Sequence, residues 1–492
     1  MNNLLVFPLL IPLCTAILLL FFKNQVRLQR WISAIGMLLQ ITVSCLLAFQ
    51  VRAEGVQVLH MGGWIPPYGI VFVADMLAVL LVLTASLVSA FCLFYSFGTI
   101  GKERERYYFY PFFQFILVGI NGSFLTGDLF NLFVCFEVML ISSYALIVLG
   151  GTRRQLRETL KYILINILSS TLFVAAVAYL YGVVGTLNMA DLSVKIAEAG
   201  QSGILHVIAL LFMIVFSLKA GLFLFFWLPG SYGAPPAAVT ALFAALLTKV
   251  GIYALLRTFT LIFHTDLAIT ESWIKWMAIA TMLLGAFGAV AYQDIRRIMN
   301  YNVVISVGFI ALGLAVSSKA SLDGAVFYLL HDMLGKALLF ILGGLIIQAS
   351  GTDGLQHMGG LIKRYPLMGW LFLLATLAIA GIPPFSGFTG KLLLLQGGLQ
   401  KGEYVLTAVA LASSLIVLYS LIRIFMAAFW GEEKRELDQM PLLSNKLLLP
   451  AVGLSVLVIG MGLGSEAVYG WVSVAGDTLL HPATYIDAVL KE

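Results

Sequence analysis

The chain has 492 residues, of which 61% are hydrophobic and 11% charged, and its formal net charge is +5. Soluble domains contain about 45–50% apolar and about 25% charged residues, so this composition excludes a soluble globular protein and indicates that the bilayer is the solvent. The positive charge does not indicate nucleic-acid binding, because most of the basic residues lie in short loops between apolar segments.

The apolar segments are long enough to cross a bilayer as helices. A hydrocarbon core about 30 Å thick requires roughly 20 helical residues, and backbone groups in lipid must find their hydrogen bonds within the segment. The sequence therefore predicts an all-α integral membrane protein with about 14 transmembrane helices. In chain order the segments are 4–22, 31–50, 76–96, 110–126, 129–150, 160–184, 203–228, 237–263, 273–291, 303–317, 324–348, 367–400, 405–430 and 447–468.

The basic residues predict the orientation. Loops on one side of the predicted topology carry more than twice as many Lys and Arg residues as loops on the other side. Basic loops remain in the cytoplasm, so both termini are expected outside.

Two apolar segments, 216–237 and 377–394, combine proline, glycine and a lysine. Proline inside a membrane helix frees carbonyl groups, which are tolerated only where protein or water satisfies them. Broken helices at corresponding places in two halves are typical of repeat-built ion transporters. The spacing predicts two inverted five-helix repeats, helices 4–8 and 9–13, in which helices 7 and 12 are broken. The expected units are 1–109, 110–263, 264–430 and 431–492.

Five charged residues inside the predicted helices need an account: Glu137, Lys219, Lys249, Lys336 and Lys391. A charge at the bilayer centre costs roughly 2.5–3.5 kcal/mol even on the most lenient scale, so each group must be paired, hydrated or neutral. Desolvation lowers the pKa of a lysine and a nearby carboxylate raises it. A buried lysine can therefore gain and lose a proton as its partner approaches and leaves, and the row predicts a proton pathway.

Structural alternatives compete with this interpretation. Glu137 and Lys219 could form a static ion pair between two helices, although buried pairs stabilise poorly compared with apolar packing. Lys249 has no acidic residue in its own helix, so a purely structural role leaves it without a partner.

The other lysines also have structural readings. Lys336 lies four residues after Asp332, so the two could form an ordinary pair on a helix surface. Lys391 could extend to the membrane interface. His331 is either a member of the proton relay or a satisfied core histidine. Asp75 is expected to be solvated at a helix end.

Taken together, these residues resemble the antiporter-like family of proton-pumping membrane subunits, which occur in respiratory complex I, membrane-bound hydrogenases and Mrp-type multisubunit sodium/proton antiporters. The resemblance covers nearly the whole chain. The stretches that carry it are 62–64 (GGW), 66–70 (PPYGI), 128–133 (DLFNLF) leading to Glu137, 218–219 (LK), 227–229 (WLP), 234–235 (AP), 249–253 (KVGIY), 294–298 (DIRRI), His331 with Lys336, and 381–385 (GIPPF) through Lys391.

Within the family the departures favour the Mrp type over complex I. Many complex I relatives have histidine where Tyr232 stands, and serine and histidine where Ile305 and Ser306 stand. The largest relatives carry a long lateral helix, for which the tail after Val468 leaves no room. The tyrosine leaves open how protons reach the middle of the subunit.

The resemblance implies six proton-pathway residues, in the order Glu137, Lys219, Lys249, His331, Lys336 and Lys391. The first two would form a coupling pair, the third a central carrier, the next two a link into the second half, and the last a group beside a neighbouring subunit or the exit. The resemblance also implies a bacterial cell membrane location. The implied partners are protons, Na⁺, membrane lipid and the other Mrp subunits, especially the large A and small C subunits.

The leading hypothesis is a proton-conducting membrane subunit of a multisubunit cation (Na⁺)/H⁺ antiporter, with no covalent substrate chemistry and no cofactor. The chain contains no P-loop, no dinucleotide-binding glycine motif and no nucleophile elbow. The alternative is a pump subunit of a redox complex, either complex I NADH:quinone oxidoreductase or a membrane-bound hydrogenase. A self-contained solute transporter ranks last, because no organic-substrate pocket is evident in the sequence.

Overall fold

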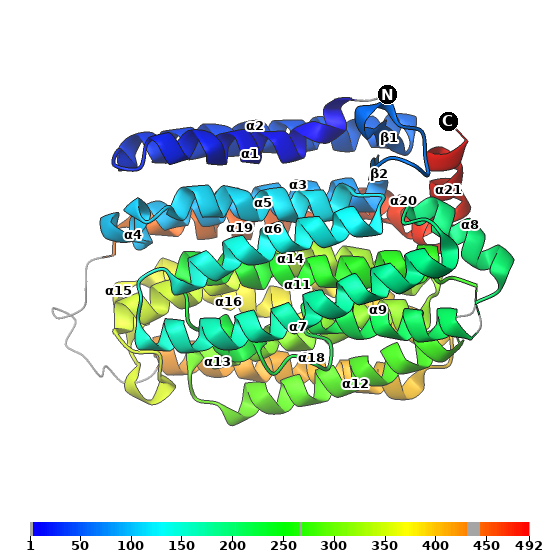
Figure 1. The fold of residues 1–492 in the computed structure, drawn as a ribbon. Coiled ribbons are helices and arrows are strands. Elements are labelled where there is room, and N and C mark those ends of the chain that lie inside the picture. Colours follow the sequence, from blue (N-terminus) through cyan, green and yellow to red (C-terminus); the bar gives the residue numbers. More distant parts are fainter. Residues whose placement is uncertain (1–2, 202, 266–267, 431–442, 492) are drawn as a thin grey trace.

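The computed structural model describes residues 3–201, 203–265, 268–430 and 443–491 as a bundle of roughly parallel helices (Figure 1). The long helices are α1 (Phe7–Phe21), α2 (Val26–Glu54), α3 (Met76–Thr99), α5 (Phe109–Leu125), α6 (Leu129–Val148), α7 (Arg153–Val184), α9 (Ile204–Ala220), α11 (Ala237–Arg257), α12 (Ala268–Ala291), α13 (Ile295–Val316), α14 (Lys319–Ser350), α16 (Pro366–Ala380), α17 (Ser386–Gln400), α18 (Tyr404–Phe425) and α19 (Leu449–Leu463).

Shorter elements lie at the ends of the bundle. The remaining helices are α4 (Lys102–Arg106), α8 (Met189–Ala199), α10 (Leu228–Ser231), α15 (Leu361–Arg364), α20 (Ser465–Leu480) and α21 (Ala483–Leu490). The strands β1 (Gln57–His60) and β2 (Val71–Ala74) form an antiparallel pair.

The long helices agree with the apolar segments of the sequence. Among the described residues, 11 helices are long and apolar enough to cross a membrane, and α5, α9 and α16 are shorter apolar helices of 10–17 residues. Each predicted segment overlaps one of these helices, and several helices extend beyond the predicted bounds. The prediction of an all-α protein with many membrane-spanning helices is therefore confirmed.

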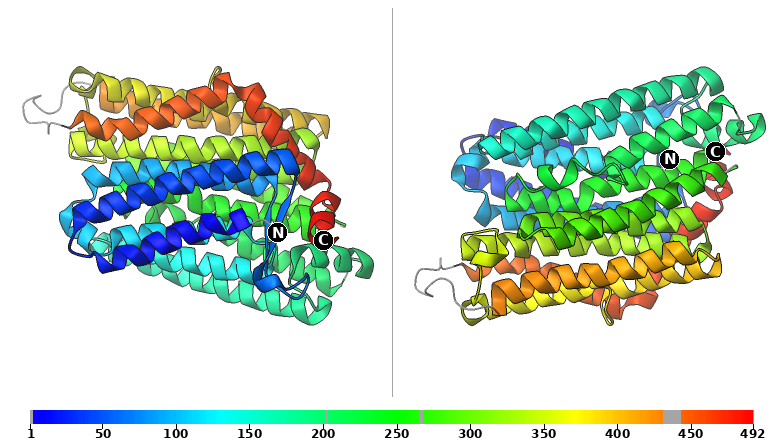
Figure 2. Two further views of the ribbon diagram at one scale, coloured as in Figure 1. Left: turned by 90° about the horizontal axis from the view of Figure 1, so that it is seen from above. Right: turned by 90° about the horizontal axis from the view of Figure 1, so that it is seen from below.

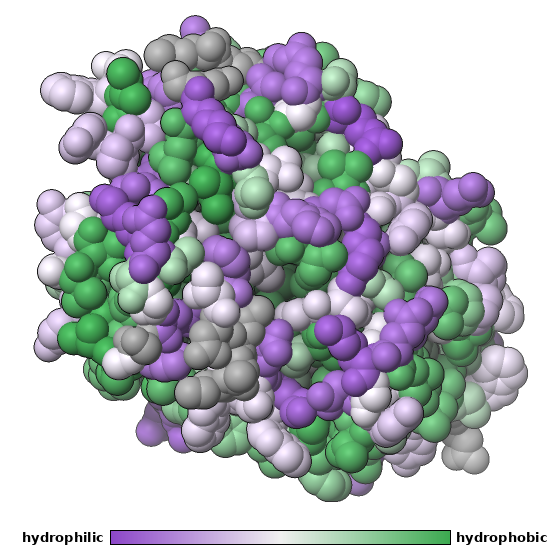
Figure 3. Space-filling model, turned by 90° about the vertical axis from the view of Figure 1, so that its right-hand side faces the viewer, coloured by the Kyte–Doolittle hydropathy of each residue, from purple (hydrophilic) through white to green (hydrophobic). Residues whose placement is uncertain are grey.

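The two ends of the bundle differ. Both marked termini lie at one end, beside the two strands, α8 and α21, whereas α4 and α15 lie at the other (Figure 1). Hydrophilic residues spread over the end that carries the termini, as expected for a surface in water (Figure 3). The opposite end carries basic segments such as Lys102–Arg106.

The residues that cap four helices recur at the same sequence interval in the two halves of the chain. The side chain of Asp128 caps α6 and that of Asp294 caps α13, whereas Thr152 begins a capping box at α7 and Ser318 begins one at α14. The same number of residues separates Asp128 from Asp294 and Thr152 from Ser318. Both α7 and α14 have 32 residues. The first and second halves of the chain thus share a register.

Two helices are interrupted where the sequence combines glycine and proline. The α9 helix ends at Ala220 and α16 ends at Ala380, and each is followed by a glycine in the left-handed conformation, Gly221 with φ 75° and Gly381 with φ 85°. Glycine adopts this conformation without a Cβ penalty, which makes it a common helix terminator. The carbonyl groups at both helix ends are thereby released inside the bundle.

The last helix of each half ends in the same way. Five-residue π-helical turns follow both α11 and α18. Just before them, the Arg257 guanidinium lies 5.3 Å from the Tyr253 ring, and the Arg423 guanidinium lies 5.9 Å from the Tyr419 ring. The sequence separation between the two arginines equals that between the caps of α6 and α13.

The C-terminal region is more helical than predicted. The predicted last helix ends at Leu463, and the expected short tail forms α20 and α21, which turn across the end of the bundle (Figure 2). Serine, glycine and acidic residues interrupt the apolar character of α20, so hydropathy alone did not indicate it. The expected unit boundary at 430/431 adjoins residues 431–442, which lie outside the described part.

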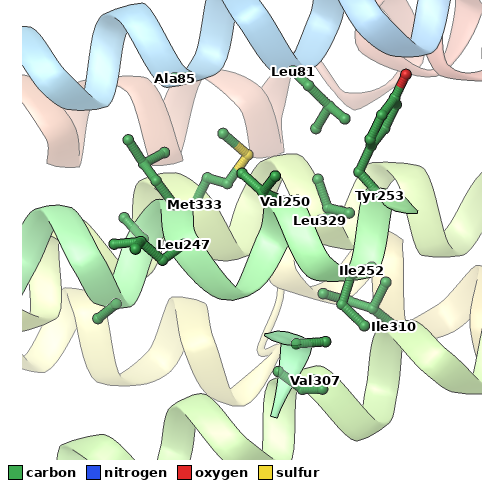
Figure 4. Close-up of a cluster of buried hydrophobic side chains, with 14 of the residues drawn as sticks. Leu81, Ala85, Leu247, Val250, Ile252, Tyr253, Val307, Ile310, Leu329 and Met333 are labelled. Carbon is green, nitrogen blue, oxygen red and sulfur yellow. The ribbon is translucent and has the colours of Figure 1, made fainter. Parts of the chain in front are cut away.

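The centre of the bundle is apolar and closely packed. Side chains from α3, α11, α13 and α14 form a cluster around α11 that includes Leu81, Val250, Val307 and Leu329 (Figure 4). All residues of α11 from Ala238 to Arg257 are buried. Any charged side chain on α11 therefore needs its partner inside the bundle.

Candidate functional site

The first group of buried polar residues joins α6, α7 and α9. The Ser170 hydroxyl donates a hydrogen bond to the Glu137 carboxylate, and the Lys219 ammonium donates to Ser170 Oγ at 3.2 Å. The ammonium also lies 4.9 Å from the centre of the Phe136 ring. In the described part of the chain, no direct ion pair joins Glu137 to Lys219. A serine that the sequence did not single out therefore links the predicted pair.

Lys219 and Glu137 differ in how deeply they are buried. Lys219 is only 6% exposed, whereas Glu137 is half-buried near the outside of the subunit. A small cavity beside Lys219 is lined by Asn166, Trp227 and Tyr232, among others. The Tyr232 hydroxyl has no hydrogen-bond partner among the residues described. The residue that replaces histidine thus places an unsatisfied polar group beside the lysine.

The second group lies at the centre of the bundle. Lys249 Nζ, on α11, lies 2.7 Å from Asp332 Oδ2 on α14, and Lys336 Nζ lies 3.5 Å from Asp332 Oδ1. The ammonium groups also donate to the carbonyl groups of Ala244 at 2.8 Å and Asn302 at 2.9 Å. All three charged side chains are at most 1% exposed. One carboxylate is therefore shared between two lysines.

This arrangement changes two sequence interpretations. The spacing in the sequence suggests Asp332 only as a surface partner of Lys336, but the pair is buried and the closer partner of the carboxylate is Lys249. Lys249 has no acid on its own helix, so its partner had to come from another helix. The interval between residues 249 and 332 carries no local pattern that reveals the contact.

His331 connects the centre to the second broken helix. Its Nδ1 lies 2.7 Å from Ser386 Oγ, at the start of α17, and its ring lies 5.7 Å from that of Tyr328. The other ring nitrogen is buried and has no hydrogen-bond partner within the described ranges. His331 is therefore not a fully satisfied core histidine.

Lys391 lies at the break between α16 and α17. Its ammonium donates to the carbonyl groups of Ile379 at 3.0 Å and Ala380 at 2.9 Å, and to Ser414 Oγ at 2.7 Å. A cation is favourable at the carbonyl end of a helix. The side chain is 4% exposed, so the alternative that Lys391 extends to the membrane interface is wrong.

The six predicted residues form separate groups rather than a continuous chain. Among described residues, no direct hydrogen bond joins Lys219 to Lys249 or Lys336 to Lys391. Transfer between the groups therefore requires intervening water or side-chain movement. The polar residues that the sequence reasoning missed, Ser170, Asn302, Ser386 and Ser414, are neutral residues inside apolar helices. The helical pattern gives them no distinct signal.

A further buried ion pair lies away from these groups. Arg257 Nη2 lies 2.8 Å from both carboxylate oxygens of Asp75, and the two side chains are 3% and 0% exposed. Asp75 also caps α3 by accepting from the Ala78 amide at 2.9 Å. The guanidinium lies 4.9 Å from the ring of Tyr485 on α21. The expectation that Asp75 is solvated is therefore wrong.

Comparison with known proteins identifies the family. Residues 126–417 match the family model described as "NADH:quinone oxidoreductase/Mrp antiporter, TM". The chain is 51% identical to the D subunit of the Na(+)/H(+) antiporter of Bacillus subtilis (strain 168), over 100% of both chains. It is 48% identical to the protein of the same name from Alkalihalophilus pseudofirmus, again over 100% of both chains. These relatives agree with the resemblance to the Mrp type.

Solved structures give the same result. A chain in the "Structure of Mrp complex from Dietzia sp. DQ12-45-1b" superimposes with a TM-score of 0.92 at 30% identity and covers 100% of both chains. A chain of respiratory complex I from Thermus thermophilus, at 23% identity and a TM-score of 0.83, shares the fold over 97% of this chain and 99% of its own. The chain is a multi-pass membrane protein that belongs to the NADH:quinone oxidoreductase/Mrp antiporter family of membrane subunits.

Proposed function

We propose that this chain is the proton-conducting membrane subunit of a multisubunit Na⁺/H⁺ antiporter, in a bacterial cell membrane, with partners like the A and C subunits of Mrp complexes. The observation that carries the proposal is the buried sharing of Asp332 between Lys249 and Lys336. Full-length relatives that are named as D subunits of Na(+)/H(+) antiporters favour the antiporter over a redox pump.

The proposed mechanism uses lysines as proton carriers. Lys219 changes between a charged state held near Glu137 through Ser170 and a neutral state after it releases its proton toward Lys249. The Asp332 carboxylate lies nearer to Lys249, at 2.7 Å, than to Lys336, at 3.5 Å. Charge on either lysine attracts the carboxylate, so a proton that arrives at one side weakens the hold on the other.

The second half would complete the route. His331 and its partner Ser386 lie between the central group and the break before α17, where Lys391 is held by free carbonyl groups and Ser414. A neutral lysine is a weaker partner for these carbonyl oxygens than an ammonium group. Protonation of Lys391 would therefore change how firmly α16 and α17 are joined.

We also propose fourteen membrane crossings with two inverted repeats, residues 110–263 and 264–430, between an N-terminal unit (1–109) and a C-terminal unit (431–492). The equal spacing of the caps and the matching breaks and π-helical turns support the repeats. Equivalent helices five crossings apart run in opposite directions. The positive-inside rule then places the basic end in the cytoplasm and both termini outside.

Replacing Lys219 or Glu137 with alanine tests the proposed function. In cells that lack other sodium efflux, both variants are expected to lose proton-coupled Na⁺ extrusion, measured as Na⁺-dependent pH change in everted vesicles. The amount of assembled complex, measured after purification, should remain unchanged. Full activity in both variants would refute the proposal. Flavin or iron–sulfur absorbance in the pure complex would favour the redox alternative instead.

Replacing Ser170 with alanine tests the serine link. Without the hydroxyl, the Glu137 carboxylate loses a donor and Lys219 loses an acceptor. A lost hydrogen bond to a charged group costs about 1.5–3 kcal/mol, so antiport in the same vesicles should slow by about tenfold or more. The matched control is Ser169→Ala, because Ser169 is the adjacent buried residue and, within the described part of the chain, its hydroxyl donates to the Val215 carbonyl, at 3.3 Å. Equal rates in the two variants would contradict the link.

A further inference from the structure

We propose that an anionic phospholipid binds with its phosphate in a basic cavity between the starts of α7 and α13. We call this cavity of about 920 Å³ the basic vestibule. Its lining includes Arg153, Arg154, Arg157, Lys161 and Arg297. Lipid binding there depends only on the membrane location of the chain, and it does not require that Lys219 carries protons.

The vestibule has an excess of positive charge. Five cationic side chains line it, against two carboxylates. One carboxylate, Asp294, is committed to the amides of Arg296 and Arg297, at 2.7 and 3.3 Å. The other, Glu158, lies 3.2 Å from Lys161 and 4.0 Å from Arg157. Arg154 lies 3.8 Å from Asp353. The lining cations still outnumber these three carboxylates. Arginine presents several donors in a geometry that fits phosphate oxygens, so the remaining charge suits an anion with several oxygens.

The positive charge continues into an apolar surface on one face of α7. Arg157, Lys161, Leu164 and Leu168 follow one another at helical spacing and lie on the same face. The side chains of Arg157 and Lys161 are 74% and 50% exposed, and Leu164 and Leu168 are 59% and 57% exposed. A ligand that follows this face meets two cations and then leucines. Phosphate followed by an acyl chain matches that order, whereas a nucleotide or free phosphate uses only its first part.

The vestibule is lined in part by the segment that follows the short α9 helix. It has 17 residues, compared with 32 in the neighbouring α7, and beyond Ala220 the chain continues as a non-helical segment. In that segment Phe226 lines the vestibule and is 67% exposed. Basic pockets between membrane helices are known to bind anionic headgroups, and the exposed Phe226 ring offers an apolar surface beside this one.

A ligand in the vestibule would influence Lys219, the first of the buried lysines in the chain. Trp227 lines both the vestibule and the small cavity beside Lys219, and its indole nitrogen donates to the Leu218 carbonyl at 3.1 Å. Trp227 is thus the residue that the linings of the two spaces share. Without a bound anion, the cationic side chains of the vestibule oppose the approach of protons and other cations to Lys219 from the vestibule, and the negative charge of a bound phosphate offsets that repulsion. Anionic lipid is thus expected to accelerate transport.

The occupant can be captured directly in the intact complex. Replacing Phe226 with the photoreactive p-benzoylphenylalanine places a cross-linker in the vestibule. After irradiation of native membranes, peptide mass spectrometry should find a phospholipid adduct on the fragment that contains position 226. Cross-linking only to a partner polypeptide, or to no lipid, would overturn the proposal.

The charges can be tested by transport. The vestibule variant Arg153→Gln/Arg157→Gln/Lys161→Gln is compared with Arg27→Gln/Lys102→Gln/Arg106→Gln, three exposed charges in other basic segments. The complexes are reconstituted in phosphatidylcholine vesicles with and without phosphatidylglycerol. Each lost cation should weaken lipid binding about fivefold, so only the vestibule variant should lose stimulation by phosphatidylglycerol.

Two arms of this experiment decide the source of the phosphate. Inorganic phosphate added to phosphatidylcholine vesicles should not reproduce the stimulation, because it lacks the acyl chains that contact α7. Stimulation by inorganic phosphate, or equal stimulation of both triple variants by phosphatidylglycerol, would refute a specific lipid site. Loss of all transport in Lys219→Ala, with the Phe226 lipid adduct retained, keeps this proposal separate from the proposed function.

Discussion

Asp332→Asn is expected to abolish Na⁺-dependent proton transport, although it removes no lysine. The amide cannot balance the charges of Lys249 and Lys336, which have 0% exposed side chains and lie 2.7 and 3.5 Å from the carboxylate. Removing one partner of a buried ion pair costs about 3–5 kcal/mol, and loss of the proton from a lysine avoids that cost. The central carriers would then remain neutral. The measurement is the pH change on Na⁺ addition to everted vesicles that contain equal amounts of complex.

A matched control is Asp323→Asn on the same helix. Asp323 is also buried, but its partner Lys319 is 34% exposed at the end of α14 and retains Asp477 at 2.8 Å. That variant should keep most of the transport rate. Asp332→Glu, which preserves the charge, should recover part of the activity. A wild-type rate in Asp332→Asn would exclude the shared carboxylate from the mechanism.

Arg257→Met is expected to destabilise the protein more than any change in the lysine row. It leaves the Asp75 carboxylate buried and without its cation, a loss of about 3–5 kcal/mol, and it removes the contact with the Tyr485 ring on α21. The midpoint of thermal unfolding of the detergent-solubilised complex should therefore fall. The additional change Asp75→Asn should restore part of the loss, because the two side chains interact directly.

The equivalent arginine in the second half provides the control. Arg423 donates to the carbonyl groups of Val290 and Ala289, and no ion pair with a carboxylate is found for it in the described residues. Arg423→Met therefore leaves no carboxylate without a counter-ion and should cost less stability. If both arginine variants unfold at the same temperature, the ion pair with Asp75 contributes nothing beyond hydrogen bonding.

The helices and their interruptions could be predicted because their signals are local. Apolar length indicates a membrane helix, and the glycine and proline clusters after Ala220 and Ala380 mark where α9 and α16 end. The amphipathic helix α20 was missed, because its polar residues lower the mean hydropathy that reveals a membrane helix.

The site could be predicted only in part, because its partners come from different helices. The cost of burying Lys219 and Lys249 marks them as functional candidates in any sequence. The pairing of Lys249 with Asp332 depends on how α11 packs against α14, and the pairing of Asp75 with Arg257 depends on α3 and α11. Ser170 carries no charge, so its position between Glu137 and Lys219 became apparent only from the structure.

The ion pair between Asp75 and Arg257 also limits which motions are available for transport. Arg257 is the last residue of α11, and Lys249 lies about two turns earlier on the same helix. The ion pair with Asp75 therefore holds this end of α11 against the start of α3 and limits how far Lys249 can shift along the helix axis. The apolar cluster around α11 opposes its rotation (Figure 4). Any elevator or rocking movement of α11 would have to break this ion pair and the packing of the cluster, or carry α3 along with it. The proposed proton transfer at the centre is therefore expected to use rotation of single side chains and transient hydration while α11 keeps its position.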